Sequence, residues 1–504
     1  MPRTSSKPST LGELRESGYG PRTVREEVYC NLMRKIEAGE ELFPGIIGYE
    51  ETVIPELENA LLAGQNVIVL GERGQAKSRL IRAMTSLLDA EVPVVAGSEL
   101  NDDPLAPVSP AAKKRVAEEG DRTPVDWLPR AARYGEKLAT PDVSMADLIG
   151  DVDPIKVAEG RYLADELTIH YGLVPRTNRG IFCVNELPDL PERIQVALFN
   201  VMQERDIQIK GYRIRLPLDM LVFATANPED YTNRGRIITP LKDRFGAQVR
   251  THYPQTLADE QAIVEQERVR FAAGDDRVVV PDYMADIVAE ISALARRSPE
   301  INQRSGVSVR VSIANNETLR SAALKRALRL GEKTASPRIT DLPAILSSMR
   351  GKIELESVEE GREAAVIEEL TKRAVLSVFN LRFEPASLNG LVGTFDEGLA
   401  LTTGAGLPSA DYVRIKDTVK GLRTAVDKLG AKSPAEVASA AEFVLEGLHL
   451  NRMLNRDRVG GGYSYVREPT PVQPPRPLGE HGPTPRPPGE EGPRRRPRRQ
   501  ENSN

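Results

Sequence analysis

The sequence predicts an α/β domain with a doubly wound parallel sheet, followed by helical regions. Three observations support this prediction. Short apolar runs recur in the first half of the 504-residue chain, at residues 67–70, 180–186 and 220–227, and the last two of them end in polar residues. Helical patterns alternate with these runs, which is typical of a parallel sheet whose ligand lies at the carboxyl ends of its strands. From about residue 257 to about residue 454 the apolar spacing is helical almost throughout.

The other elements follow in chain order. Residues 23–38 are predicted to form a helix, and residues 92–96 a second strand. Residues 101–139 are predicted to be a long polar insertion on the core of the α/β domain. Residues 207–216 alternate between apolar and polar side chains around a Lys-Gly pair and predict a β-hairpin. The Pro/Gly/Arg-rich residues after 460 cannot bury enough apolar surface to order themselves.

The composition is that of a globular protein with no electrostatic preference for nucleic acid. The 68 Lys and Arg residues nearly balance 73 Asp and Glu residues, and the net charge is −5. No apolar run approaches the roughly 18 residues of a membrane span, and the polar N-terminus lacks the apolar core of a signal peptide. Two distant cysteines, Cys30 and Cys183, argue for a reducing compartment and against a disulfide framework or a zinc site. We therefore expect a cytoplasmic protein.

A phosphate-binding loop follows the first apolar run. The spacing fits Gly-x4-Gly-Lys-Ser/Thr, except that Ala76 stands for the second glycine. Backbone N–H groups at the start of a helix form an anion nest, Lys77 can reach the β- and γ-phosphates, and Ser78 can ligate Mg²⁺. We expect Ala76 to be tolerated if its backbone is near-helical, because only a positive φ requires glycine. The residues expected around the phosphates are Gly71, Arg73, Gly74, Gln75, Ala76, Lys77, Ser78 and Arg79.

Two later strands also end in polar residues. Asn185 and Glu186 close the run at 180–186, and Asn227 closes the run at 220–227. The carboxyl ends of parallel strands meet at one edge of a sheet, so these side chains should face the phosphate loop. At this edge of the sheet, an NTPase needs a phosphate cradle, a metal-holding group, a carboxylate for the attacking water and a polar sensor. Arg244 lies shortly after Asn227 and adds a cation.

In this order and spacing the motifs resemble those of AAA+ ATPases, specifically the branch of MoxR proteins and magnesium-chelatase motor subunits. The resemblance covers about residues 43–346. It is also carried by Asp-Leu-Ile-Gly at 147–150, Thr-Asn-Arg-Gly at 177–180 and Met-Gln-Glu-Arg at 202–205. Each motif alone is weak, but several in the correct order form a specific pattern.

The resemblance implies a P-loop NTPase (AAA+) fold with a helical lid and a further helical region. The expected regions are an N-terminal extension, partly helical (1–42), an AAA+ nucleotide-binding domain (43–254), a helical lid (255–351), a C-terminal helical region (352–459) and a disordered Pro/Arg-rich tail (460–504). The resemblance also implies an insert at residues 151–180 and a hairpin at residues 207–217, both facing a ring partner or pore.

The resemblance further implies roles within one subunit. Lys77 and Ser78 match the Walker A lysine and hydroxyl, which bind ATP and Mg²⁺. Glu186 matches the Walker B glutamate that polarises water, and Asn227 matches sensor 1. Ordinary structural alternatives exist: Glu186 can be a helix-start carboxylate favoured by the dipole, and Asn227 can end a strand in a turn.

Other matched positions concern the lid, the base and the neighbouring subunit. Arg244 matches the arginine finger, which acts on ATP bound in the next subunit; its structural alternative is a surface ion pair with Asp243. Arg310 matches the lid arginine called sensor 2, with Arg304 as the rival for that role. The segment that contains Ile47 and Gly48 resembles the one that packs on adenine.

One position departs from the branch. Asn185 stands where the branch has an aspartate that helps to hold Mg²⁺. An amide oxygen can accept a hydrogen bond from a metal-bound water, but it contributes no charge. We expect weaker metal binding or slower turnover, with loss of hydrolysis as the alternative.

The resemblance therefore implies a motor that binds Mg-ATP between the subunits of a ring, expected to be a hexamer. Such a motor would remodel a partner protein or assist the insertion of a metal or cofactor, commonly with a separate partner that carries a von Willebrand A domain. A nucleotide-dependent assembly scaffold with little hydrolysis is the first alternative. A DNA-acting AAA+ protein is the second, and it depends on the basic run at residues 494–499.

Overall fold

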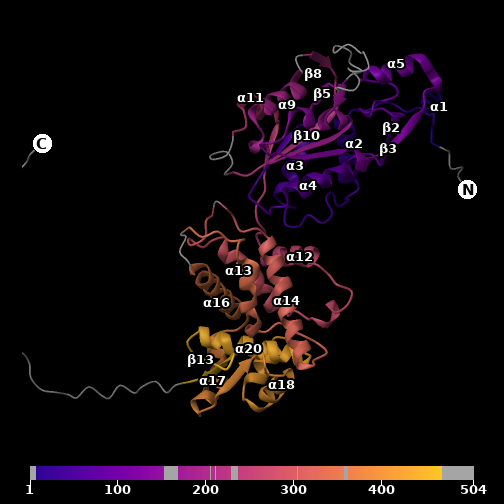
Figure 1. Ribbon diagram of the computed structural model, residues 1–504. Helices are drawn as coiled ribbons and strands as arrows, with labels where there is room; N and C mark the ends of the chain where they lie inside the picture. Colours follow the sequence, from indigo (N-terminus) through magenta and orange to yellow (C-terminus); the bar gives the residue numbers. More distant parts are fainter. Residues whose placement is uncertain are drawn as a thin grey trace, which may run out of the picture. The chain divides into compact units, whose positions relative to one another are not determined.

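The computed structural model describes residues 7–152, 169–204, 206–209, 212–228, 236–303, 305–356 and 361–467 (Figure 1). Its helices up to residue 250 are α1 (Leu11–Glu16), α2 (Val24–Glu37), α3 (Val53–Leu62), α4 (Lys77–Ala83), α5 (Pro110–Glu119), α6 (Met145–Leu148), α8 (Leu173–Arg176), α9 (Glu192–Glu204) and α11 (Thr239–Arg244). The later helices are α12 (Leu257–Glu267), α13 (Asp282–Ala295), α14 (Arg310–Leu330), α15 (Leu346–Met349), α16 (Arg362–Arg382), α17 (Asn389–Asp396), α18 (Ser409–Thr418), α19 (Leu422–Lys428) and α20 (Pro434–Leu450).

A five-stranded sheet organises the α/β domain. Its strands are β1 (Val67–Leu70), β4 (Tyr134–Leu138), β7 (Gly180–Asn185), β10 (Met220–Ala226) and β11 (Ala247–Arg250). Their spatial order is β11-β1-β10-β7-β4, and every neighbouring pair is parallel. The predicted doubly wound parallel sheet is therefore confirmed. Because β10 lies between β1 and β7, the residue after β10 is next to both of the other strand ends.

Both faces of this sheet are covered by helices. Val67 and Val69 of β1 belong to the core cluster that also holds buried residues of α2, α3 and α4. The alternate residues, Ile68 and Leu70, belong to the cluster that holds residues of α9 and α11. A strand buried on both faces is continuously apolar, which is why the sequence marks β1, β7 and β10 so clearly.

The predicted strand at residues 92–96 is present, but it lies outside the central sheet. The apolar residues near 92–96 form β2 (Glu91–Val95), which pairs with β3 (Val125–Pro129) in a separate antiparallel pair. The central sheet instead continues with β4, which lies inside the predicted polar insertion and pairs with β7 alone. As an edge strand, β4 is only partly buried, and its sequence, Tyr-Gly-Glu-Lys-Leu, lacks the apolar run on which the prediction depended.

The other predicted elements have mixed outcomes. The predicted helix at 23–38 is α2, and the predicted hairpin is the antiparallel pair β8 (Asp206–Ile209) and β9 (Tyr212–Arg215). Strands β5 (Gly150–Val152) and β6 (Ile169–Tyr171) pair at the ends of the expected insert, whose residues 153–168 lie outside the described residues. The described helices include none with the length and hydropathy that a membrane crossing requires.

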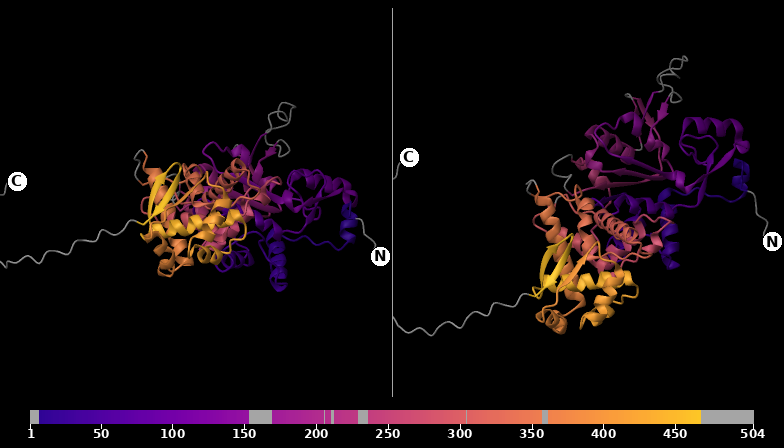
Figure 2. Two further views of the ribbon diagram at one scale, coloured as in Figure 1. Left: turned by 90° about the horizontal axis from the view of Figure 1, so that it is seen from below. Right: turned by 60° about the horizontal axis from the view of Figure 1, so that its bottom comes forward.

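The later half of the chain is largely helical, as predicted, with one addition. Strands β12 (Leu401–Gly404), β13 (Asn455–Val459) and β14 (Gly462–Val466) form an antiparallel sheet in the order β12-β14-β13 (Figure 2, with β13 and β14 in yellow). The expected tail boundary at 460 therefore falls inside a hairpin. Gly460 and Gly461 both have positive φ, at 52° and 83°, as a two-residue hairpin turn requires. The tail from residue 468 lies outside the described residues.

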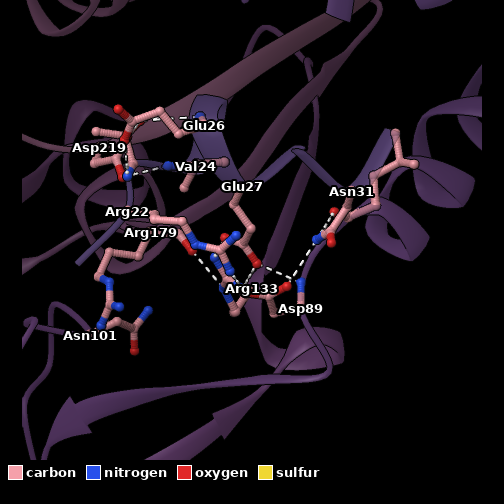
Figure 3. A network of polar contacts seen from close by, with 12 residues as sticks. Arg22, Val24, Glu26, Glu27, Asn31, Asp89, Asn101, Arg133, Arg179 and Asp219 are labelled. Carbon is pink, nitrogen blue, oxygen red and sulfur yellow. Dashed lines mark hydrogen bonds and ion pairs between the residues drawn. The ribbon is translucent and has the colours of Figure 1, made fainter. Parts of the chain in front are cut away.

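A buried ion pair fixes the N-terminal extension to the α/β domain (Figure 3). Both guanidinium Nη atoms of Arg133 donate to the Glu27 carboxylate of α2, over 2.7 and 2.6 Å, and the two side chains are only 1% and 4% exposed. Arg133 Nε also donates to the carbonyl of Arg179, just before β7. The start of α2 is held by Asp219 Oδ2, which accepts from the Val24 N–H over 2.8 Å; burial raises the pKa of Asp219.

Glu27→Ala should lower the free energy of unfolding by about 3–5 kcal/mol, because Arg133 would stay buried without its counter-charge. Urea unfolding followed through the only tryptophan, Trp127 of β3, measures this loss. The matched control is Glu118→Ala, which breaks an exposed (i,i+4) pair with Lys114 and should change stability by less than about 0.5 kcal/mol. Equal effects of the two substitutions would contradict the structural role of the buried pair.

The two cysteines should react differently with a thiol reagent at pH 8. Cys183 is 0% exposed on β7, and burial raises the pKa of its thiol to about 12, so the reactive thiolate is scarce and inaccessible. Cys30 is exposed on α2. We expect one thiol to be labelled in the native protein and two after denaturation; fast labelling of both would show that β7 is open to solvent.

Candidate functional site

The loop between β1 and α4 is shaped by close contacts that only glycine permits. Gly74 has a φ of 77°, and a Cβ at that position would lie 1.8 Å from Oγ of Ser308 in the later helical half. A Cβ on Gly71 would lie 1.8 Å from Oγ1 of Thr251. Gln75 is buried, and its Oε1 accepts hydrogen bonds from the Glu72 N–H and from Thr251 Oγ1, over 2.9 and 2.8 Å. The loop therefore has a fixed shape before α4 begins.

Ala76 does not have the near-helical backbone that its expected tolerance required. It is the N-cap residue of α4, with φ 54° and ψ 17°, in the left-handed region. The position thus has the conformation that favours the glycine of the motif, and alanine occupies it at a cost of about 1–2 kcal/mol. The condition for its tolerance is therefore not met, and alanine strains the loop at this position.

Lys77 lies where the ends of β1 and β10 meet. Its Nζ donates to Asn227 Oδ1 over 2.7 Å and to the carbonyl oxygens of Glu72 and Gly71, over 3.0 and 2.5 Å. The residue is only 7% exposed. The ammonium group is therefore held by oxygen atoms at the mouth of the loop, where a phosphate oxygen would meet it.

Ser78 and Asn185 form the second contact between the loop helix and a strand end. Asn185 Oδ1 accepts from Ser78 Oγ over 3.0 Å and from Thr225 Oγ1 over 3.3 Å. The amide Nδ2 donates to the carboxylate of Glu136 on β4. Mg²⁺ prefers oxygen ligands and is commonly held by few protein groups together with waters and phosphates. The hydroxyl of Ser78 and the amide oxygen of Asn185 fit that donor set.

Glu136 itself is held by several donors. Arg82 of α4 donates through Nε and Nη2, over 2.7 and 2.9 Å, and Tyr134 donates through its hydroxyl over 3.1 Å. Burial acts to raise the pKa of Glu136, but the hydrogen bonds from Arg82 and Tyr134 outweigh it, and the pKa lies below its usual value. Glu136 is therefore a carboxylate at neutral pH.

Glu186 is held beside Lys77 by Asn227. Asn227 Nδ2 donates to Glu186 Oε2 over 2.7 Å, while its Oδ1 accepts from Lys77. The Glu186 N–H donates to Thr225 Oγ1 over 3.0 Å, and the backbone of Glu186 is left-handed, with a φ of 57°. Although Glu186 precedes a short 3-10 helix, its side chain makes no capping hydrogen bond there. The carboxylate instead faces the site.

The remaining predicted residues lie around this centre, and the structure does not bring Arg244 into it. Arg244 ends α11, with a side chain that is 37% exposed; it pairs with Asp243 over 3.3 Å, and its guanidinium lies 5.6 Å from the centre of the Phe199 ring. Arg310 is exposed at the start of α14, two residues after Ser308. Arg304 lies outside the described residues.

The predicted adenine segment is tied to the loop. Next to Ile47 and Gly48, the hydroxyl of Tyr49 lies within hydrogen-bond distance of the carbonyl oxygens of Gln75 and His252, at 2.8 and 2.9 Å, and shares its one proton between them. The carbonyl of Arg73 accepts from Tyr253, and Arg79 pairs with Glu267 of α12. The loop, the segment at 46–49 and the start of the helical half are therefore joined at one place.

Sequence reasoning missed Glu136, Thr225 and Thr251. Thr225 could have been recognised from the sequence, because it is the only polar residue inside the apolar run of β10. Thr251 directly follows β11, a strand with only one buried residue, and Glu136 lies on the strand that the prediction did not recognise.

Ala76→Gly should raise the free energy of unfolding by about 1 kcal/mol, because relief of left-handed strain exceeds the added freedom of the unfolded chain. Ala83→Gly is the matched control in the same helix. Its φ is −63°, so glycine there should lower stability by about 0.5–1 kcal/mol. Urea unfolding of both variants checks the opposite signs; a loss of stability at position 76 would contradict the assignment of strain.

Comparison of the sequence with known proteins finds relatives that are named magnesium-chelatase subunits. The magnesium-chelatase subunit ChlI of Nostoc sp. strain PCC 7120 is 29% identical over 238 residues, which cover 44% of this chain and 58% of the relative. The chloroplast subunit ChlI-1 of Arabidopsis thaliana is 29% identical over 245 residues, which cover 45% of this chain and 52% of the relative. The chain thus spans little more than half the length of these relatives. No protein-family model matches the chain.

Solved structures align over a larger share of the chain, but their sequence identity to it is lower. A model of the complex between the BchI and BchD subunits of magnesium chelatase has a TM-score of 0.34 and 21% identity, covering 65% of this chain and 98% of that one. NtrX from Brucella abortus in complex with ATP has a TM-score of 0.36 and 14% identity, covering 69% and 66%. In sequence and in motif order, the chain is similar to the MoxR and magnesium-chelatase branch of the AAA+ ATPases.

Proposed function

We propose that the protein hydrolyses Mg-ATP. The observation that carries this proposal is the hydrogen-bonded set Lys77–Asn227–Glu186 and Ser78–Asn185, assembled from the ends of three parallel strands. These groups are the parts that phosphoryl transfer to water requires: a cation and backbone N–H groups for the phosphates, oxygens for the metal, and a carboxylate for the attacking water. The relatives named magnesium-chelatase subunits support the same assignment.

Each group has a definite task in this proposal. Lys77 and the N–H groups at the start of α4 hold the β- and γ-phosphates. Ser78 and Asn185 would hold Mg²⁺, which when bound neutralises charge on these phosphates. Glu186 orients the attacking water and accepts its proton. Asn227 keeps the Glu186 carboxylate at a fixed distance from Lys77, so that neither group collapses onto the other.

We propose a ring, a hexamer as in the sequence prediction, because Arg244 stands apart from its own site. An exposed arginine at the end of α11 can reach a nucleotide bound to a neighbouring copy. The work of such a ring would be to remodel a partner protein or assist metal or cofactor insertion, with a separate von Willebrand A partner. The relatives are subunits of a multi-subunit enzyme by name, which supports a partner. We place the protein in the cytoplasm because it carries free thiols.

A nucleotide-dependent scaffold is the second candidate, and Asn185 favours it. An amide at this position contributes no charge to Mg²⁺, so ATP can be held with little hydrolysis. The DNA-acting alternative depended on the basic run at 494–499, which lies outside the described residues, and no observation favours it.

Glu186→Gln should leave ATP binding intact and lower hydrolysis by about 10²- to 10⁴-fold, because the amide cannot accept the proton of the attacking water. Steady-state phosphate release and equilibrium binding of a fluorescent ATP analogue measure the two effects. Glu192→Gln, an exposed position on the adjacent α9, is the matched control. If wild type and Glu186→Gln release phosphate at the same near-background rate, the ATP-hydrolysing motor is rejected and the nucleotide-dependent scaffold remains.

Arg244→Ala should lower hydrolysis by about 10³- to 10⁵-fold if the arginine acts as a finger. The sharper test mixes this variant with Glu186→Gln. Each is inactive alone, but a Glu186→Gln subunit can supply Arg244 to the intact Glu186 site of its neighbour, so the mixture should recover activity. Arg193→Ala, an exposed arginine of α9, is the control. No recovery in rings shown to be mixed would rule out action between subunits.

A further inference from the structure

The amide at position 185 has a carboxylate partner on the neighbouring strand. Asn185 Nδ2 donates to Oε1 of Glu136, and Glu136 also accepts two hydrogen bonds from Arg82 and one from Tyr134. The Glu136 side chain is 19% exposed. The carboxylate is therefore fully hydrogen-bonded, and it comes from β4, the strand beside the one that carries Asn185.

This environment allows only one orientation of the Asn185 amide. A carboxylate only accepts hydrogen bonds, so the NH₂ group must face Glu136. On the opposite side, Thr225 accepts from the Glu186 N–H and therefore directs its own hydroxyl proton to Asn185 Oδ1. The amide oxygen is thereby aimed at Ser78 Oγ, 3.0 Å away. The reverse orientation would place the amide oxygen against a carboxylate and the NH₂ group against the metal-binding side.

We propose that Glu136 is a positioning residue of the metal site: it holds the amide oxygen of Asn185 toward Ser78 and is compatible with asparagine, not aspartate, at position 185. This inference rests on the proposed function, since the metal is the Mg²⁺ that accompanies ATP. An aspartate would place its second oxygen where Nδ2 now lies, in contact with the Glu136 carboxylate, and two like charges would meet. Asn185 is thus one half of a matched pair with Glu136.

The inference reverses a simple expectation. If Asn185 were only a weakened aspartate, Asn185→Asp would strengthen metal binding. With Glu136 in place, we expect Asn185→Asp to weaken it. Asn185→Asp combined with Glu136→Gln should restore it, because the amide introduced at position 136 can donate to the new carboxylate. Glu136→Gln alone keeps an acceptor oxygen for Asn185 and should have a small effect, whereas Glu136→Ala frees the amide to rotate.

The test measures Mn²⁺ affinity of the full chain in complex with ADP by electron paramagnetic resonance, and ADP affinity in EDTA. Glu136→Ala and Asn185→Asp should each weaken Mn²⁺ binding by about 10- to 100-fold, as expected when the support of a metal ligand is lost. The double variant should return to within about threefold of wild type, a coupling typical of residues in contact. ADP affinity in EDTA should stay unchanged throughout. Glu119→Ala, which breaks an exposed Arg–Glu pair on α5, is the control.

Each outcome has a distinct meaning. Tighter Mn²⁺ binding by Asn185→Asp alone would overturn the inference. So would effects of Asn185→Asp and Glu136→Gln that simply add in the double variant. In both cases the proposed function would still stand, provided that the protein binds nucleotide. If the wild-type protein binds no nucleotide in either condition, the proposed function fails and the inference fails with it. Urea unfolding followed through Trp127 identifies any variant that has lost its fold; for such a variant, Glu136→Gln and the double variant alone decide the result.

Discussion

The hydrogen bonds from Lys77 to Asn227 and from Ser78 to Asn185 join the first turn of α4 to the ends of two strands, and the site depends on both. They can form because all strands of the sheet are parallel and β10 lies between β1 and β7. Asn227, which follows β10, therefore meets both Lys77 and Glu186. Residues separated by about 40 to 150 positions in the chain become neighbours through strand order alone.

The same constraint explains how much of the fold could be predicted. Strands buried on both faces carry apolar runs, so β1, β7 and β10 were recognisable, and their polar ends located the candidate site. The edge strand β4 has one face against the domain and a mixed sequence, so periodicity could not identify it. Glu136 was missed for that reason, and with it the contact that orients Asn185. Side-chain partners across strands depend on register, which no local pattern contains.

Motifs that resemble those of the branch also have structural tasks away from the candidate site. In Thr-Asn-Arg-Gly at 177–180, Asn178 donates to the carbonyl of Leu100 and accepts from the N–H of Asp219. Arg179 pairs with Asp103 over 3.1 Å and donates to the carbonyl of Pro93. These contacts hold the β2–β3 unit and its connection against the start of β7. The residues of this motif thus have a structural role, because they attach the β2–β3 unit to the central sheet.

Backbone strain is concentrated where the chemistry is proposed. Among the described residues, five non-glycine positions have positive φ, and two of them, Ala76 and Glu186, follow β1 and β7 at the site. Such conformations cost about 1–3 kcal/mol each and persist only when surrounding contacts enforce them. For Glu186 these contacts are the hydrogen bonds with Thr225 and Asn227. A relaxed backbone there would turn the carboxylate away from Asn227 and Lys77. The strained backbone is therefore what points the Glu186 carboxylate into the site, and the hydrogen bonds at the strand ends offset its free-energy cost.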